Sequence, residues 1–344
     1  MRAVRLHAPG EALRVEDVPM PEPRGTEVRI RVAGAGVCHT DLHIVDGIQA
    51  RVELPRTLGH EVSGWVDVAG PDAGKLLRRA RLKPGDPVVV YGAWGCGACL
   101  QCRNGDEQRC ADSVAPGFQA DGGYAEFMLV PHPRHLVALG DLDPARAAPL
   151  ADAAITPLNA VRRASPWLTP GARVLVIGAG ALGQFALQLL RLVVPRGRDL
   201  LVAVRELEPE RLERAAELGA DVGLLAVEPE LTIEGLNGPP DVVFDFVGTD
   251  GTLAHASEVV APGGAIVLVG EAGGEVAFGM ERQTVESWLT TVSWGSPGDL
   301  RVVVRLARRG RLQWEVETRP LEDAATAHDR LRRSEVRGRI VLTP

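Results

Sequence analysis

Alternating charged and apolar positions predict a strand near the N-terminus. From Glu27 to Val32 the order is E-V-R-I-R-V, in which every second side chain is apolar, as in a strand with one buried face. Over the next hundred residues glycine and proline recur at short intervals, which is typical of short strands joined by turns. The first part of the chain is therefore predicted to be mostly β.

A second pattern begins after Pro170 and Gly171. The run R-V-L-V-I-G has the continuous apolar character of a buried strand, and A-L-G-Q-F-A-L-Q-L-L-R-L-V-V is apolar at helical spacing. Further buried-strand runs follow (L-L-V-A-V, D-V-V-F-D-F-V-G and A-I-V-L-V-G), with helical segments such as 209–218 between them. Strands that alternate with helices predict a doubly wound parallel sheet, covered on both faces.

The C-terminal segment predicts a polar helix, V-V-V-R-L-A-R-R-G, and a closing strand, G-R-I-V-L-T-P. We expect this strand to rejoin the first domain, so that the second domain is an insertion within the first. The predicted fold is α/β with a β-rich domain formed by 1–153 and 298–344, interrupted by a doubly wound domain formed by 154–297.

Length and charge narrow the class of protein. A chain of 344 residues exceeds the usual size of one hydrophobic core, which favours two domains. The net charge of −7 gives no reason to expect nucleic acid or an anionic membrane as a partner. The N-terminus lacks the apolar core of a signal peptide and no eighteen apolar residues run together, so we expect a cytoplasmic protein.

A glycine-rich turn follows the strand R-V-L-V-I. Gly178 allows a tight turn, Gly180 lets backbone approach a pyrophosphate, and Gly183 brings helix and strand together. The helix that begins with Ala181 and Leu182 offers free N–H groups to the phosphates. A helix in any α/β protein can start at glycines, but the flanking strand and helix favour a dinucleotide site.

An acidic residue follows the next strand. Glu206 stands where a carboxylate accepts hydrogen bonds from the adenosine ribose hydroxyls, which favours NAD over NADP. Arg205 beside it weakens this preference, because arginine accommodates the 2′-phosphate of NADP. An ordinary surface charge is the alternative for Glu206.

Four of the five cysteines form a compact motif within 95–111. The odd number of cysteines and the missing export signal disfavour disulfides and favour metal ligation. The spacing C-x2-C-x2-C-x7-C suits four thiolates around one structural zinc, with every position filled by protein. An iron–sulfur cluster is the competitor, although the bacterial ferredoxin run closes with x3 and a proline. The four ligands are Cys96, Cys99, Cys102 and Cys110.

The fifth cysteine, Cys38, needs a separate explanation. His60 and Asp152 would complete a set of one sulfur, one nitrogen and one oxygen, leaving a fourth position on a catalytic zinc for substrate. Sequence spacing alone does not group these three residues.

Several motifs together resemble the medium-chain zinc-dependent alcohol dehydrogenases. They are Cys38-His-Thr-Asp, Gly59-His60-Glu61, the four-cysteine lobe, Asp121-Gly-Gly-Tyr-Ala-Glu-Phe and the glycine-rich turn, in the family's order along almost the whole chain. The resemblance implies a GroES-like catalytic domain interrupted by a Rossmann NAD-binding domain, with two Zn²⁺ per chain. It implies reversible hydride transfer from a zinc-bound alkoxide to NAD, giving an aldehyde or ketone.

One departure concerns the catalytic zinc. Many family members have a cysteine where this chain has Asp152. The charge of the ligand set is unchanged, but a harder oxygen ligand donates less electron density, which predicts a more Lewis-acidic and more easily lost metal.

The resemblance also assigns roles around the catalytic zinc. Thr40 would take the proton of the alcohol and His43 would pass it to solvent, through the cofactor ribose. Asp41 would fix the tautomer of His60, and Glu61 would steady or transiently contact the metal.

Three further assignments follow from matched positions. His39 and Arg339 match contacts to the pyrophosphate, although an exposed His39 and a salt-bridged Arg339 fit the sequence equally well. Trp94 matches a wall of the substrate pocket, with plain core packing as the alternative. His132 and His135 lie in a proline-rich loop and are interpreted as solvated rather than as ligands.

The favoured function is an NAD-dependent alcohol dehydrogenase acting on a small alcohol, aldehyde or ketone, as a homotetramer or homodimer by resemblance. A polyol, threonine or formaldehyde dehydrogenase of the same family is the nearest rival. A zinc-free quinone reductase is disfavoured by the zinc motifs. From other classes, a catalytically silent nucleotide-sensing protein is disfavoured by Thr40 and His43, and a nucleic-acid-binding zinc module by the acidic residues of the lobe.

Overall fold

The computed structural model describes residues 1–49, 52–194, 199–226 and 235–344. The chain divides into two compact units, one formed by Met1–Ile155 with Trp294–Pro344 and the other by Thr156–Ser293. The sequence placed these divisions at 153 and 298. No helix in the described part of the chain is long and apolar enough to cross a membrane.

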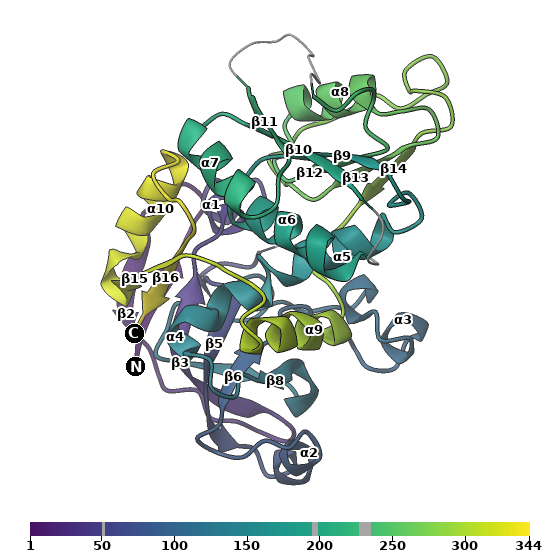
Figure 1. The fold of residues 1–344 in the computed structure, drawn as a ribbon. Helices are drawn as coiled ribbons and strands as arrows, with labels where there is room; N and C mark the ends of the chain where they lie inside the picture. The colour runs from purple at the N-terminus through teal and green to yellow at the C-terminus, as the bar shows by residue number, and fades with distance from the viewer. Residues whose placement is uncertain (50–51, 195–198, 227–234) are drawn as a thin grey trace. The chain divides into compact units, whose positions relative to one another are not determined.

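The first unit is built on two sheets (Figure 1). The larger has the strand order β15-β16-β3-β5-β6-β8, with β7 beside β3, and the smaller has the order β2-β1-β4. The last strand pairs antiparallel with β3, Val341 opposite Gly36, which confirms the prediction that the C-terminus rejoins this unit. The strands are β1 (Arg2–Leu6), β2 (Arg14–Asp17), β3 (Val28–Gly36), β4 (Arg56–Thr57), β5 (Glu61–Ala69), β6 (Pro87–Val90), β7 (Phe127–Val130), β8 (Leu136–Ala138), β15 (Val316–Pro320) and β16 (Arg339–Thr343).

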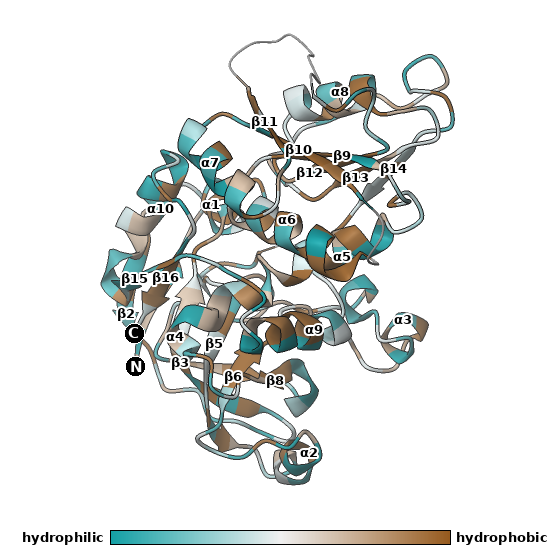
Figure 2. Ribbon diagram, in the orientation of Figure 1, coloured by the Kyte–Doolittle hydropathy of each residue, from teal (hydrophilic) through white to brown (hydrophobic). Residues whose placement is uncertain are grey.

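Short helices cover these sheets. Helix α10 is amphipathic, because Ala324, Ala327 and Leu331 recur at helical spacing and pack in one core with Ile340 and Leu342 of β16; Figure 2 shows hydrophilic and hydrophobic residues along it. The helices of this unit are α1 (His39–Val45), α2 (Ala73–Arg79), α3 (Leu100–Arg103), α4 (Pro144–Ala147), α9 (Pro297–Arg308) and α10 (Ala324–Arg332), with the 3₁₀ helices η1 (Glu107–Arg109), η2 (Pro133–His135), η3 (Ala148–Ala151) and η4 (Leu321–Asp323).

The second unit is a parallel sheet in the order β11-β10-β9-β12-β13-β14. Strands β9, β10, β12 and β13 match the buried apolar runs of the sequence, whereas the edge strands β11 and β14 are partly exposed; Figure 2 shows hydrophobic residues along the central strands. The strands are β9 (Arg173–Ile177), β10 (Leu201–Glu206), β11 (Val222–Leu225), β12 (Val242–Asp245), β13 (Ala265–Leu268) and β14 (Trp288–Thr291), and the helices are α5 (Ile155–Arg163), α6 (Ala181–Val193), α7 (Pro209–Glu217) and α8 (Asp250–Val259).

Alternate residues of β9 enter different cores. Val174 and Val176 pack in one cluster with Leu187 of α6, whereas Leu175 packs in another with Ala256 of α8. Figure 1 accordingly shows α6 and α8 on opposite faces of this sheet. A sheet buried on both faces explains the continuous apolar runs, and it confirms the predicted doubly wound α/β fold.

Candidate active site

The glycine-rich turn lies at the carboxyl end of β9. Strand β9 lies between β10 and β12: the chain continues to β10 and β11 on one side of it and to β12, β13 and β14 on the other. In such sheets, ligands bind at the carboxyl ends of the strands where the order changes direction in this way. Gly178 has φ +89°, and a Cβ at Gly183 would lie 2.0 Å from the Gly178 carbonyl oxygen, so both positions require glycine. A Cβ at Gly180 would meet nothing within 4 Å, so protein packing does not explain that glycine. Open space at the start of α6, where Ala181 and Leu182 are the first helical residues, suits approach of a phosphate.

Glu206 ends β10 beside this turn. Its carboxylate is 7 % exposed and accepts hydrogen bonds from the N–H groups of Ala179 (2.7 Å) and Leu207 (2.8 Å). Arg205 precedes it, and burial together with the charge of Arg205 lowers the pKa of His255 to about 4. This carboxylate is fixed against the glycine-rich turn, and its contact with the ribose hydroxyls stays a prediction.

In the first unit, Cys38 lies at the N-cap of α1. The Asp41 carboxylate reaches back and accepts from the Cys38 N–H at 3.0 Å, as the acidic residue of a capping box does. The Sγ atom of Cys38 lies 3.7 Å from Thr40 Oγ1. The start of one short helix therefore gathers the sulfur, the hydroxyl and the carboxylate of the first motif.

Four donor groups converge beside this helix. One donor atom from each of Cys38, His60, Glu61 and Asp152 lies within 4.8 Å of the others. Asp152 Oδ2 is 4.0 Å from Cys38 Sγ and 3.7 Å from His60 Nε2. The structure thus brings together the three ligands grouped from the sequence, with Glu61 in addition, and this sulfur, nitrogen and oxygen set fits zinc.

The charges around His60 also fit a cation. The side chain of His60 is 2 % exposed, with Nε2 toward Asp152 and Nδ1 3.6 Å from Asp41 Oδ1. Burial lowers the pKa of His60, but the charge of Asp41 and hydrogen bonds to Asp152, Asp41 and Cys38 outweigh it and hold that pKa well above its usual value. The surrounding acidic groups therefore favour a positive charge at their centre, which a divalent cation would supply.

Glu61 is held by Arg339 in a buried ion pair. Arg339 donates to Glu61 Oε1 at 2.6 Å and to the Val37 carbonyl at 3.3 Å. Burial raises the pKa of Glu61 and the charge of Arg339 opposes that rise, while Glu61 Oε2 has no hydrogen-bond partner among the described residues. These contacts match the salt-bridged alternative for Arg339, and its pyrophosphate contact stays a prediction.

Two aromatic side chains pack on His60, and neither lies in a motif identified from the sequence. The rings of Phe118 and Trp294 meet the imidazole edge-on at centroid distances of 5.9 Å and 6.1 Å. Trp94 instead donates its indole N–H to the Tyr91 carbonyl at 2.5 Å and stacks on His135. These contacts of Trp94 are those of core packing, and its place in the substrate pocket stays a prediction.

The remaining predicted residues lie on α1. His39 is exposed at the first position of the helix. His43 is half-buried, and burial lowers its pKa despite the nearby charges of Asp46 and Asp41. Thr40 and His43 are three positions apart, so they lie on one face of the helix.

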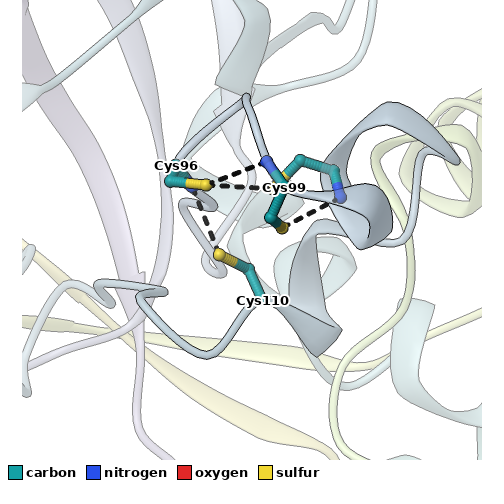
Figure 3. Close-up of side chains that lie close together, drawn as sticks. Cys96, Cys99 and Cys110 are labelled. Atoms are coloured by element: carbon teal, nitrogen blue, oxygen red, sulfur yellow. Dashed lines mark hydrogen bonds between the residues drawn. The ribbon is translucent and has the colours of Figure 1, made fainter.

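The cysteine lobe forms a second donor set. Donor atoms of Cys96, Cys99, Cys102 and Cys110 all lie within 4.8 Å of one another, and none is in a disulfide. Figure 3 shows the thiols of Cys96, Cys99 and Cys110 pointing toward one another, and the Cys96 and Cys102 sulfurs are 4.0 Å apart. Four sulfurs around a tetrahedral zinc are separated by about 3.8 Å, so the lobe fits that ion.

The protonation of these thiols agrees with a cation site. N–H groups of Ala98 and Cys99 lower the pKa of Cys96 to about 6. Burial and hydrogen bonds to the other thiols raise the pKa of Cys102 to about 12. Thiols packed this closely compete for protons, and a divalent cation would allow all four to ionise.

A buried ionic contact anchors the lobe and corrects one interpretation from the sequence. Glu107 accepts from the Gly95 N–H at 3.0 Å and pairs with His135 Nε2 at 3.0 Å and with Arg134 at 3.3 Å. The prediction that His135 is solvated is wrong, because its side chain is 1 % exposed. The proline-rich surroundings gave no indication of Glu107, which is 28 residues away.

Comparisons with known proteins find relatives that match the whole length of the chain. Residues 24–141 match the model of the alcohol dehydrogenase GroES-like domain, and residues 218–342 match the zinc-binding dehydrogenase model. The chain is 37% identical to a D-arabinose 1-dehydrogenase (NADP+) of Saccharolobus solfataricus, covering 100% of this chain and 97% of that one. It is 35% identical to an NAD-dependent alcohol dehydrogenase of Sulfurisphaera tokodaii, covering 100% of both. Among solved structures, the alcohol dehydrogenase of Aeropyrum pernix superposes with a TM-score of 0.92 at 36% identity, covering 100% of both chains.

A doubly wound unit with a glycine-rich turn, together with a unit that carries a buried sulfur, nitrogen and oxygen donor set, defines an oxidoreductase of the metal-dependent dehydrogenase class. The chain belongs to the zinc-dependent alcohol dehydrogenase family of the medium-chain dehydrogenases/reductases.

Proposed function

We propose that this alcohol dehydrogenase oxidises a small alcohol to an aldehyde or ketone with NAD at the centre formed by Cys38, His60 and Asp152. The observation that carries this proposal is the convergence of these donors within 4.8 Å of one another. Their two negative charges and one neutral imidazole would balance one Zn²⁺, and Glu61 offers a further oxygen. A zinc ion held there would act as a Lewis acid that lowers the pKa of a coordinated hydroxyl.

The chain's own residues would remove the proton of the alcohol. Thr40 lies 3.7 Å from Cys38, at the edge of the donor centre, and its hydroxyl both accepts and donates. His43 lies on the same helix face, and its lowered pKa keeps the imidazole neutral and able to accept a proton near neutral pH. Phe118 and Trp294 beside His60 would exclude water from the reacting atoms.

Glu206 supports NAD as the cofactor. A buried carboxylate would accept hydrogen bonds from the ribose hydroxyls and would repel the 2′-phosphate of NADP. Hydride from the alcohol carbon would pass to the nicotinamide while the hydroxyl proton leaves through Thr40 and His43, so charge and atoms balance.

A sugar dehydrogenase is the second candidate. Two observations favour it: the D-arabinose 1-dehydrogenase (NADP+) matches the full chain, and Arg205 adjoins Glu206. Arginine at this position is the side chain that binds a 2′-phosphate, so this candidate also predicts use of NADP.

The test measures nicotinamide absorbance on zinc-replete protein, with NAD and with NADP, across primary alcohols, secondary alcohols and aldoses including D-arabinose. Turnover of simple alcohols with NAD is the expected result. Preference for an aldose with NADP would favour the second candidate. Folded protein with zinc at both centres that turns over none of these compounds would contradict both.

A further inference from the structure

The motif Asp121-Gly-Gly-Tyr packs directly on the segment that precedes His60. Gly122 donates to the Thr57 carbonyl at 2.8 Å, and Tyr124 donates to the Leu58 carbonyl at 2.9 Å. A Cβ at Gly122 would lie 2.3 Å from the Gly59 carbonyl oxygen, so only glycine permits this approach. The motif therefore fixes the backbone of Tyr124 against the backbone that leads into His60.

The Tyr124 side chain joins a buried chain of hydrogen bonds behind the metal centre. Its hydroxyl oxygen lies 3.1 Å from Asp41 Oδ2 and 3.3 Å from His328 Nε2. Tyr124 and Asp41 are 0 % exposed and His328 is 3 % exposed. The hydrogen bonds run from His328 on α10 through Tyr124 to Asp41, and Asp41 Oδ1 lies 3.6 Å from His60 Nδ1 as a close charge contact within the first unit.

Proton count sets the direction of every bond in this chain. The Asp41 carboxylate already accepts from the backbone N–H groups of Cys38 and Gly59, and a carboxylate that is held by N–H donors acts as an acceptor. The Tyr124 hydroxyl must then donate its single proton to Asp41, and its oxygen accepts from His328 Nε2–H. Asp41 Oδ1 lies closest to His60 Nδ1, which favours the tautomer that carries its proton on Nδ1. Nε2, on the side of Asp152, then keeps its lone pair for a metal ion.

Three donors from separate segments hold the Asp41 carboxylate. They are the Cys38 N–H at 3.0 Å, the Gly59 N–H at 3.2 Å and the Tyr124 hydroxyl. The two backbone groups are present whatever the side chains, whereas the third depends on Tyr124 and, through it, on His328. A phenylalanine at either position would fill the same apolar space, so packing alone does not account for the two polar atoms buried there.

We propose that Tyr124 and His328 are positioning residues for the metal ligand His60, acting through Asp41. The inference rests on the metal centre of the proposed function. It predicts that loss of the Tyr124 hydroxyl or of the His328 imidazole loosens the orientation of the His60 ring and speeds metal release from this centre. The fold should be unchanged, and the cysteine lobe should keep its metal.

The experiment follows zinc release into a chromogenic chelator for four variants: Tyr124→Phe, His328→Phe, His328→Gln and the double phenylalanine variant. The phase that changes in Asp152→Asn identifies the catalytic site. Loss of a group that contacts a ligand directly costs about 10- to 100-fold in affinity. Tyr124 acts one contact further out, through Asp41, so Tyr124→Phe should speed this phase by about 10-fold, the lower end of that range. His328→Phe should act in the same direction more weakly, and His328→Gln, which keeps a donor, should restore part of the loss.

The double variant separates positioning from packing. If His328 acts through the Tyr124 hydroxyl, His328→Phe adds nothing in the Tyr124→Phe background. A second readout is the visible absorption of cobalt(II) exchanged into the faster-releasing site, whose bands report ligand geometry and should shift in Tyr124→Phe. Leu331→Val is the matched control, because it loosens the buried face of α10 without removing a hydrogen bond. It should lower Tm and leave the release rate and the cobalt bands unchanged.

Each outcome is decisive. Wild-type release rates and cobalt bands in both Tyr124→Phe and His328→Phe would overturn the inference while leaving the metal centre standing. Full additivity in the double variant, or an equal effect of Leu331→Val, would reduce the two residues to packing. A wild-type protein with no release phase sensitive to Asp152→Asn would overturn the proposed metal centre together with the inference. If Tyr124→Phe does not fold, the two His328 variants carry the test.

Discussion

Asp152 decides the character of the donor centre at the scale of single residues. Its carboxylate is 13 % exposed and stands between the sulfur of Cys38 and the imidazole of His60. A carboxylate supplies the same charge as a thiolate but is a harder ligand, so it binds zinc less tightly. The ligand chemistry therefore predicts that a metal at this centre exchanges more readily than a metal in the cysteine lobe.

Asp152→Asn should lose the catalytic metal. The amide has the same size but no charge, so the remaining ligands would balance only part of the charge of the ion. We expect one zinc per chain instead of two, and kcat/KM lower by about 100-fold or more. Metal analysis and steady-state kinetics check this. Asp152→Cys is the matched control, since it restores a charged ligand and should keep two zinc ions; full activity and two zinc ions in Asp152→Asn would contradict the assignment.

His43→Gln should slow proton removal without affecting the metal. Glutamine keeps hydrogen-bonding atoms but cannot accept a proton, and general base catalysis contributes on the order of 100-fold. We expect kcat for alcohol oxidation to fall by about 10- to 100-fold near pH 7 and to recover at higher pH, where hydroxide takes the proton. Zinc content should stay at the wild-type value. An unchanged pH profile of kcat would remove His43 from the relay; His7→Gln, directly after strand β1, is the control.

At the scale of elements, the lobe and η2 are tied by one carboxylate. Glu107 pairs with His135 and Arg134 at the point where the lobe meets the rest of its unit. Glu107→Gln keeps an acceptor for the Gly95 N–H and removes the charge, so the free energy of unfolding should fall by about 1 to 3 kcal/mol. Thermal unfolding and metal analysis check this. Unchanged stability would mean that the thiolate site alone orders the lobe.

A helix of the second unit carries a pH-dependent contribution to stability. The pKa of His255 in α8 is lowered from 6.5 to about 4 by burial and by Arg205. Between these values the unfolded chain binds the proton and the folded chain does not, so stability falls as the pH falls from about 6.5 to about 4. His255→Gln should therefore show a smaller decrease in Tm between about pH 7.5 and about pH 5 than the wild type. Equal decreases would contradict this.

The elements also show what could be predicted from the sequence. The strands β9, β10, β12 and β13 and helix α6 were predictable because a sheet buried on both faces requires continuous apolar runs. The cysteine lobe was predictable because its four ligands are local. Contacts across long separations were not, since nothing local to His328 indicates Tyr124, 204 residues away, and nothing local to Arg339 indicates Glu61, 278 residues away.

At the scale of the whole molecule, the second unit has an apolar surface that one chain leaves uncovered. Strand β14 is the edge of the sheet and pairs only with β13 within the described residues. On it and on the segment before it, large apolar side chains face solvent: Phe278, Met280, Val285 and Trp288. An exposed strand edge beside such side chains is a frequent site of association between copies of a chain.

We therefore expect a homodimer or homotetramer that buries this surface. Met280 is 98 % exposed, so Met280→Glu cannot disturb packing within the chain. If a second copy covers this side chain, the variant must bury an unpaired carboxylate in the interface, which would shift the equilibrium toward monomer. Light scattering coupled to size exclusion measures the mass, and Leu100→Glu, at another exposed apolar side chain, is the control. A Met280→Glu protein with the same mass as the wild type at every concentration would place the interface elsewhere, and a monomeric wild type would contradict the expected oligomer itself.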